Sequence, residues 1–444
     1  MTAPARGGDA ESGRPATPTL PVLVAAAGAP WEAQALRRLE GPHPAVPGGT
    51  GVVLAKRCVD LADLLATAGT SAAAVAVVSP TLPGLDADSV ARLHRAGLGV
   101  LLVADPDELD EERSERWRRL GIDRLLPSTR LDDLVAAAAG AGSGAGPAGP
   151  DDRVPAGVEH GRGVPGRLLV VWGPTGAPGR TTVAVGLAAE IAAAGRDVLL
   201  VDVDAYGGAV AQHLGVLDEA SGLLAAARAA NSGHLDGDRL AGLARQLSDR
   251  LRVLTGLPRP DRWSEVRPRA FDSVLEEALR LSSHVVLDVG FGLQPEQADP
   301  YGGAGPQRST MTVTSLQRAD EVLVVGAADP VGLSRLARGL VEVHELLPGV
   351  RPRVVVNRTR ASLGWTDREI RGMVEGFVRP VDVHFLPDDR AAADRALMAG
   401  KSLAESGESA LRSAMTALAA GVLGESATSE RRRRFRRRRA GRGR

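Results

Sequence analysis

Hydrophobic and polar positions alternate regularly between Pro21 and about Gly140. Five apolar runs are separated by stretches whose apolar residues recur at helical spacing. The runs read PVLVAAA, GVVLA, AAAVAVVS, GVLLVAD and DRLLP, and the intervening stretches include WEAQALRRLE, LADLLATA, DSVARLHRAG and ELDEERSERWRRLG. This βα order predicts a small parallel sheet with helices on both faces, over residues 20–140.

A second α/β domain is predicted over residues 167–424. It is preceded by residues 141–166, which are rich in Gly, Pro and Ala without apolar period and are expected to form a flexible linker. Continuous Val/Leu runs then predict a parallel sheet that is buried on both faces. Its expected strands are Leu168–Trp172, Val198–Asp202, Leu251–Thr255, His284–Asp288, Glu321–Gly326, Arg353–Asn357 and Asp382–Leu386. Residues 1–19 and 425–444 are expected to be disordered.

The first strand of this second domain runs into a Gly/Pro-rich loop and then a helix, in the stretch RLLVVWGPTGAPGRTT from Arg167 to Thr182. Backbone N–H groups at a helix start, together with the helix dipole, favour a polyphosphate. Gly176 and Gly179 let the backbone approach phosphate oxygens, Arg180 supplies a cation, and Thr181 offers a hydroxyl to magnesium. The expected phosphate contacts are Gly176, Ala177, Pro178, Gly179, Arg180, Thr181 and Thr182.

The loop departs from the P-loop pattern G-x-x-x-x-G-K-[ST] at two fixed positions. Pro174 stands where the pattern has its first glycine, and Arg180 where it has lysine. Lys56 and Lys401 are the chain's only lysines, so arginine replaces lysine throughout the chain. Arg180 at the lysine position of the pattern is one instance of this preference. An ordinary βα turn, with glycines for close helix packing, is the alternative.

Three aspartates end predicted strands: Asp202 and Asp204 in DVLLVDVDAYGG, and Asp288 in HVVLDVG. The carboxyl ends of parallel strands are where open α/β sheets bind ligands. Any one of these aspartates could be a helix cap or a solvated strand end. Their order behind a phosphate-binding loop favours a ligand site.

With these motifs, the chain resembles the ParA/MinD-type P-loop ATPases, and within them the CpaE/TadZ-like proteins of Flp (Tad) pilus assembly. The resemblance covers roughly Arg167 to Gly424. GPTGAPGRTT is similar to the deviant Walker A loop, VDVDAYGG to switch I and HVVLDVG to Walker B. ADEVLVVGAADPVGLSRLARGL, VVVNRT and FLPDDRAAADRALMAGKSL resemble the following strand and helix, the adenine-reading strand end and the closing loop.

The resemblance implies ATP and Mg²⁺ as cofactors and a role for each matched residue. Thr181 and Asp288 hold magnesium, with Asp202 beside them supporting the switch loop. Asp204 orients the attacking water, and Arg180 neutralises phosphate charge. The base is read by Asn357, with Pro387 and Asp388 in the loop that covers it.

Proteins of this family dimerise face to face around two nucleotides, often with a lysine near the loop start that reaches the partner's phosphates. Thr175 occupies that position here. Either another basic residue substitutes for the lysine, or the ATP-dependent homodimer is weak.

The first domain resembles a response-regulator receiver in its pattern. The positions of the receiver's acidic pair, phosphoacceptor aspartate, hydroxyl residue and lysine hold Ala25 to Ala27, Ser79, Ala104 and Leu126. Without a carboxylate nucleophile and a metal site, no phosphoryl group can be accepted. Residues 20–140 are therefore interpreted as a pseudo-receiver that acts by contact with other proteins. An unrelated flavodoxin-like module is the alternative.

Charge is distributed unevenly although the formal net charge is zero. The end RRRRFRRRRAGRGR holds ten of the 54 basic residues, leaving 44 basic against 54 acidic residues before it. Such an arm suits an anionic membrane surface, non-specific nucleic acid or an acidic partner, and a merely solvated tail is the alternative. One aromatic among many arginines is too few for a base-stacking platform.

Compartment and function follow from the remaining composition. A single cysteine, Cys58, excludes an intrachain disulfide. The polar first twenty residues predict no secretory signal, and no apolar stretch is long enough for a membrane span. We therefore expect a cytoplasmic protein, peripheral at most at the inner face of the cell membrane. The expected function is a slow, dimerising ATPase switch that positions a Tad-type pilus or secretion machine; a nucleotide-binding scaffold and a DNA-partitioning ATPase are the alternatives.

Overall fold

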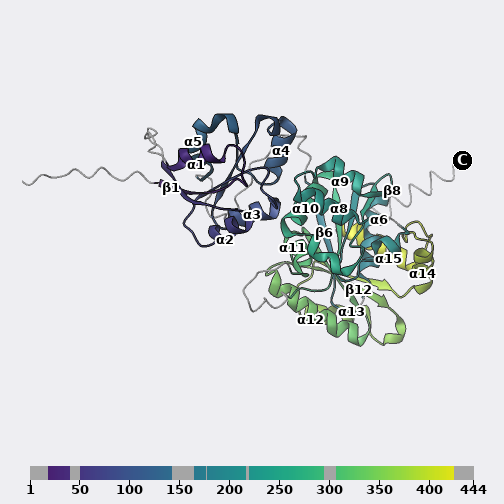
Figure 1. Ribbon diagram of the computed structural model, residues 1–444. Coiled ribbons are helices and arrows are strands. Elements are labelled where there is room, and N and C mark those ends of the chain that lie inside the picture. Colours follow the sequence, from purple (N-terminus) through teal and green to yellow (C-terminus); the bar gives the residue numbers. More distant parts are fainter. Residues whose placement is uncertain are drawn as a thin grey trace, which may run out of the picture. The chain divides into compact units, whose positions relative to one another are not determined.

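The chain folds as two α/β units that meet in sequence at Gly157 and Val158, and each unit is described by itself (Figure 1). The computed structural model describes residues 19–40, 51–142, 165–176, 178–216, 220–294 and 307–424. The expected disordered ends, except Thr19, and most of the expected linker lie outside these residues, as does Ala177 in the phosphate loop. Thr19 is instead the first residue of a strand. Among the described residues, no helix combines the length and apolar character needed to span a bilayer.

The first unit is a five-stranded parallel sheet with strand order β2-β1-β3-β4-β5. The predicted parallel α/β sheet is therefore confirmed, and its order is that of flavodoxin-like folds. Its strands are β1 (Thr19–Ala25), β2 (Gly51–Arg57), β3 (Val75–Val78), β4 (Gly99–Ala104) and β5 (Arg124–Pro127). Its helices are α1 (Glu32–Glu40), α2 (Leu61–Ala68), α3 (Ala87–Arg95), α4 (Glu111–Arg119) and α5 (Leu134–Gly142).

The central strand β3 and its neighbour β4 are buried over their whole length. Alternate residues point to opposite faces of a strand, so one apolar core forms on each side of this sheet. Helices α2, α3 and α4 cover one face, and α1 and α5 cover the other. A sheet covered on both faces explains why its central strands read as uninterrupted apolar runs.

The second unit is built on an eight-stranded sheet with strand order β13-β12-β11-β6-β10-β7-β9-β8. All seven predicted strands occur in it, and they pair in parallel. They are β6 (Arg167–Trp172), β7 (Val198–Val203), β9 (Leu251–Leu254), β10 (His284–Val289), β11 (Glu321–Ala327), β12 (Arg353–Thr359) and β13 (Val383–Pro387). The eighth, β8 (Arg245–Ser248), was not predicted and pairs antiparallel with β9 at the sheet edge.

Helices again form a layer on each face of this sheet. One layer contains α8 (Gly222–Asn231), α9 (Gly237–Leu243), α10 (Pro268–Leu281), α11 (Thr310–Arg318), α12 (Pro330–Leu346) and α13 (Asp367–Glu375). The other contains α6 (Arg180–Ala193), α7 (Val210–His213), α14 (Arg390–Met398) and α15 (Ala410–Val422). Both faces are thus covered, as a central parallel sheet requires.

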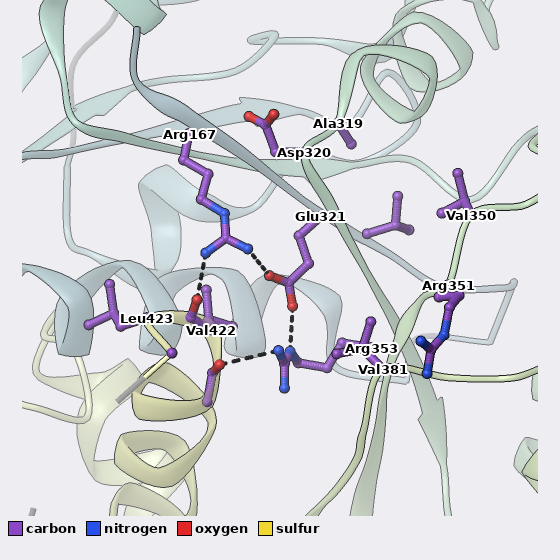
Figure 2. A pocket seen from close by; sticks show the side chains of 13 residues that line it. Arg167, Ala319, Asp320, Glu321, Val350, Arg351, Arg353, Val381, Val422 and Leu423 are labelled. Atoms are coloured by element: carbon purple, nitrogen blue, oxygen red, sulfur yellow. Dashed lines mark hydrogen bonds and ion pairs between the residues drawn. The ribbon is translucent and has the colours of Figure 1, made fainter. Parts of the chain in front are cut away.

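A pocket at the amino ends of β6, β11 and β12 is lined by a network of charged side chains (Figure 2). Glu321 accepts hydrogen bonds from Arg167 and Arg353, at 2.5 Å each. The same two arginines donate to the carbonyls of Val422 and Gly421, at 2.6 and 3.2 Å. Each of these three charged groups therefore has partners. The bonds to Val422 and Gly421 hold the end of α15 against the amino ends of the strands.

Candidate functional site

The phosphate loop lies at the carboxyl end of β6, in the middle of the sheet between β10 and β11. Gly176 and Gly179 have φ of 105° and 99°, a left-handed conformation that glycine adopts without strain. Helix α6 begins directly after Gly179, at Arg180. The first N–H groups of α6 therefore lie at the sheet edge where ligands bind in such folds.

Thr181 and Asp288 are joined across the loop, because the Thr181 hydroxyl donates to Asp288 Oδ2 at 2.6 Å. Asp288 is buried, and its Oδ1 has no hydrogen-bond partner among the described residues. Burial, together with the charge of Asp202 on the neighbouring strand, raises the pKa of Asp288 to about 8. Burial therefore disfavours the ionised form of Asp288, and a cation bound at the unpartnered oxygen would favour it.

This donor pair fits Mg²⁺, which is usually held by one or two protein oxygens, with water and phosphate completing the shell. No group of three or more His, Cys, Asp or Glu side chains in the described ranges is arranged to hold a metal ion.

Arg180 folds back over the loop. Its Nη1 lies 3.2 Å from the Gly173 carbonyl oxygen and 3.4 Å from that of Pro174, and its Nη2 lies 3.3 Å from Asp204 Oδ2. Its buried Nε has no partner among the described residues. The guanidinium thus spans the loop and the end of β7, and part of its donor capacity is unused.

Asp204 and Asp202 organise the segment after β7. Asp204 Oδ1 accepts the backbone N–H of Tyr206 at 2.8 Å and of Gly207 at 3.3 Å. Asp202 accepts the N–H groups of Asp204 and Val210, at 3.2 and 3.1 Å.

Burial is also the main cause that raises the pKa of Asp202, to about 7. Both Asp202 oxygens are thus occupied by backbone contacts that hold the loop. Its predicted place beside the metal stays a prediction.

The residues predicted to surround the base lie at the same sheet edge but differ in their contacts. Asn357, at the end of β12, donates its side-chain N–H to the Pro178 carbonyl oxygen at 2.8 Å. Pro387 ends β13, and Asp388 after it lies within ion-pair distance of Arg360 and Arg390. The structure therefore brings Asn357 to the phosphate loop, whereas Pro387 and Asp388 lie at the neighbouring strand end.

Two features of the site were missed in the sequence. A Cβ atom built on Gly176 would lie 2.0 Å from Nη1 of Arg335, so this guanidinium from α12 lies against the phosphate loop. The Tyr206 ring lies 4.6 Å from the Phe291 ring, which links the segment after β7 to the segment after β10. Both contacts are long-range and carry no local sequence signal; an arginine early in the helix after a buried strand was the only hint of the first.

In the first unit, the predicted receiver positions lie at the carboxyl ends of the strands. Ala25 and Ala104 end β1 and β4, and Ser79 directly follows β3. The buried Ser79 hydroxyl lies 2.8 Å from that of Thr81, and Asp105 accepts a hydrogen bond from Ser128 at 2.6 Å. The edge therefore presents alanines and paired hydroxyl groups.

Acetyl phosphate is expected to leave the intact mass of the protein unchanged, because Ser79 is buried and no carboxylate ends β3. Intact-protein mass spectrometry after incubation with magnesium and acetyl phosphate measures this. Addition of a single phosphate that disappears in Ser79→Ala would contradict the pseudo-receiver interpretation. Ser71→Ala, at a half-buried serine, is the control.

No protein-family model matches the chain, and no curated protein does. Solved structures similar to it include a ParA family ATPase from Chlorobium tepidum TLS, at 19% identity and a TM-score of 0.46, covering 57% of this chain and 98% of that one. The cell division ATPase MinD of Pyrococcus furiosus matches at 20% identity and a TM-score of 0.47, covering 59% and 100%. The septum site-determining protein MinD of Pyrococcus horikoshii, complexed with Mg-ADP, matches at 19% identity and a TM-score of 0.46. The match covers 58% of this chain and 95% of that one. This chain is similar to these proteins in its α/β fold.

Proposed function

We propose that the second unit binds ATP with Mg²⁺ and hydrolyses it slowly. The observation that carries the proposal is the hydrogen bond at the start of α6 between half-buried Thr181 and buried Asp288, whose Oδ1 has no partner among the described residues. Backbone N–H groups, an arginine and magnesium-type oxygen ligands converge there and together suit a polyphosphate.

Each of the chain's own groups has a defined part in this proposal. Backbone N–H groups from Gly176 to Thr182 hold the phosphates, Thr181 and Asp288 hold the metal, and Arg180 neutralises phosphate charge. Bound magnesium would offset the charge that develops on the phosphate oxygens. Asn357 keeps the loop in place through Pro178 and lies where a base could be read.

The contact between Arg180 and Asp204 supports a switch between two states. In the structure the guanidinium is shared between loop carbonyls and Asp204 Oδ2. Phosphate oxygens form stronger charge-assisted hydrogen bonds with arginine than neutral carbonyls do. Phosphate binding therefore draws Arg180 away and frees one oxygen of Asp204 to orient the attacking water.

In its wider role, the protein is proposed to be a homodimerising switch that positions or assembles a Tad-type pilus or secretion machine. The motif series from Arg167 to Gly424 and the flavodoxin-like first unit, which lacks a phosphoacceptor, support this role. The first unit would contact machine components. The basic run that would meet a membrane surface or nucleic acid lies outside the described residues, and no observation in the structure favours partitioning.

Calorimetry with Mg-ATP, followed by a turnover assay on the same sample, tests the proposal. We expect binding that depends on magnesium, and turnover below the ~1–10³ s⁻¹ of typical enzymes. Thr181→Ala should weaken Mg-ATP binding roughly tenfold or more, whereas Thr181→Ser, which keeps the hydroxyl, should bind nearly as the unmodified protein does. No binding at millimolar Mg-ATP would contradict the proposal, and binding without turnover would favour the scaffold.

A further inference from the structure

The guanidinium of Arg335 lies directly over the phosphate loop. A Cβ atom added to Gly176 would be 2.0 Å from its Nη1 and 3.0 Å from its Cζ, and the loop approaches this closely only because residue 176 is glycine. Gly176 and its neighbour Thr175 are exposed and carry no charge of their own. Arg335 therefore supplies the positive charge at this end of the loop.

The backbone of α12 fixes Arg335 in this place. Asp329 caps the helix by accepting the N–H of Gly332 at 2.9 Å. The buried Leu336, adjacent to Arg335, packs against β11, where a Cβ on Gly326 would be 2.7 Å from its side chain. One turn later Gly339 packs on Trp172 of β6. The arginine is thus carried by a rigidly packed turn of helix.

Arg335 approaches the loop from the opposite side to the magnesium-type oxygens. Strand β6, which leads into the loop, lies between β11 and β10. Asp288 is on β10, whereas Arg335 is on the helix that follows β11. A phosphate chain held by the loop would therefore have the metal on one side and this guanidinium on the other.

The guanidinium is also available for a ligand. Arg180 already shares its donors between loop carbonyls and Asp204. Arg335 makes no hydrogen bond or ion pair within the described ranges, although it is only partly exposed. A half-buried arginine whose donors have no partner among the described residues, beside a phosphate-binding loop, is suited to bind phosphate oxygens.

We propose that Arg335 is a second phosphate-contacting cation of the nucleotide site, acting together with Arg180. The inference rests on the proposed binding of Mg-ATP and adds a residue from α12 to it. Because α12 packs on β11 and β6, the contact would also connect the bound phosphates to this helix.

The test compares the full-length chain with Arg335→Gln and Arg335→Lys, using Mg-ATP affinity by calorimetry. Arg338→Gln, one turn further along α12 and exposed, is the matched control. In about 0.1 M salt we expect Arg335→Gln to bind roughly tenfold more weakly, and Arg335→Lys and Arg338→Gln to stay within about threefold. The Arg335→Gln defect should shrink in about 1 M salt, because the Debye length falls from ~10 Å to ~3 Å.

Several results would overturn the inference. Equal affinity of Arg335→Gln and the unmodified protein would do so, as would an equal loss at both salt concentrations that lysine does not restore. The latter pattern would indicate a purely structural contact, which thermal unfolding of the same variants would register. If the unmodified chain binds no Mg-ATP, the proposed function fails as well; if it binds and Arg335→Gln binds equally, only the role of Arg335 fails.

Discussion

Asp204→Asn is expected to slow ATP turnover about 10²-fold or more while Mg-ATP affinity changes by less than about threefold. The asparagine keeps an acceptor for the N–H groups of Tyr206 and Gly207, so the segment after β7 retains its fold. It loses the negative charge that faces Arg180 and that would orient the attacking water. The effect should therefore fall on kcat rather than on binding, as measured by phosphate release at saturating ATP.

Asp197→Asn provides the control. This exposed aspartate directly precedes the first residue of β7, at the end of the strand far from the site, and pairs with Arg250. Its turnover should equal that of the unmodified protein. Undiminished turnover in Asp204→Asn would remove Asp204 from the reaction. A parallel loss of affinity would instead assign the residue to holding the loop.

The sheet of the second unit was predictable because its strands are buried on both faces. Such strands read as continuous Val/Leu runs, as in Leu168–Trp172 and Val198–Asp202, whatever their neighbours are. The residues at their carboxyl ends were predictable for the same reason, since parallel strands end at a common edge. The register then places Asp202 opposite Asp288 on adjacent strands.

The edge strand β8 was not predictable from this pattern. Its sequence, RQLS, is mainly polar and its residues are exposed or half-buried, so no apolar run marks it. It exists because its backbone pairs with β9, a contact between segments that the sequence alone does not bring together.

The site was predictable in its residue types but not in its contacts. A Gly-rich loop before a helix indicates phosphate, and Thr181 and Asp288 were expected near magnesium. That Asp202 turns both oxygens to backbone N–H groups of its own loop depends on how this loop folds. That Arg335 reaches Gly176 depends on tertiary packing. Helix α12 is set against the loop by Leu336 and Gly339, and only the folded sheet brings these positions together.

Asp288→Asn is expected to stabilise the protein against unfolding at alkaline pH when nucleotide and magnesium are absent. Burial holds the pKa of Asp288 at about 8, well above the ordinary range of an aspartate near 4. Between these values the folded state keeps a proton that the unfolded state has released. The free energy of unfolding of the unmodified protein therefore falls as pH rises from about 4 to about 8. Above about pH 8 the titration of Asp288 changes it no further.

Asparagine has no such titration and keeps an amide in place of the carboxylate beside Thr181. Because one pKa unit corresponds to about 1.4 kcal/mol, the advantage of Asp288→Asn should grow by about 4 kcal/mol between pH 5 and pH 8.5. Denaturant unfolding of both proteins at the two pH values, with chelator present, measures this difference. Asp261→Asn, at an exposed carboxylate, should show no such growth. An Asp288→Asn variant that is destabilised equally at both pH values would show that the carboxylate is satisfied in the folded protein, and that no cation is needed to relieve it.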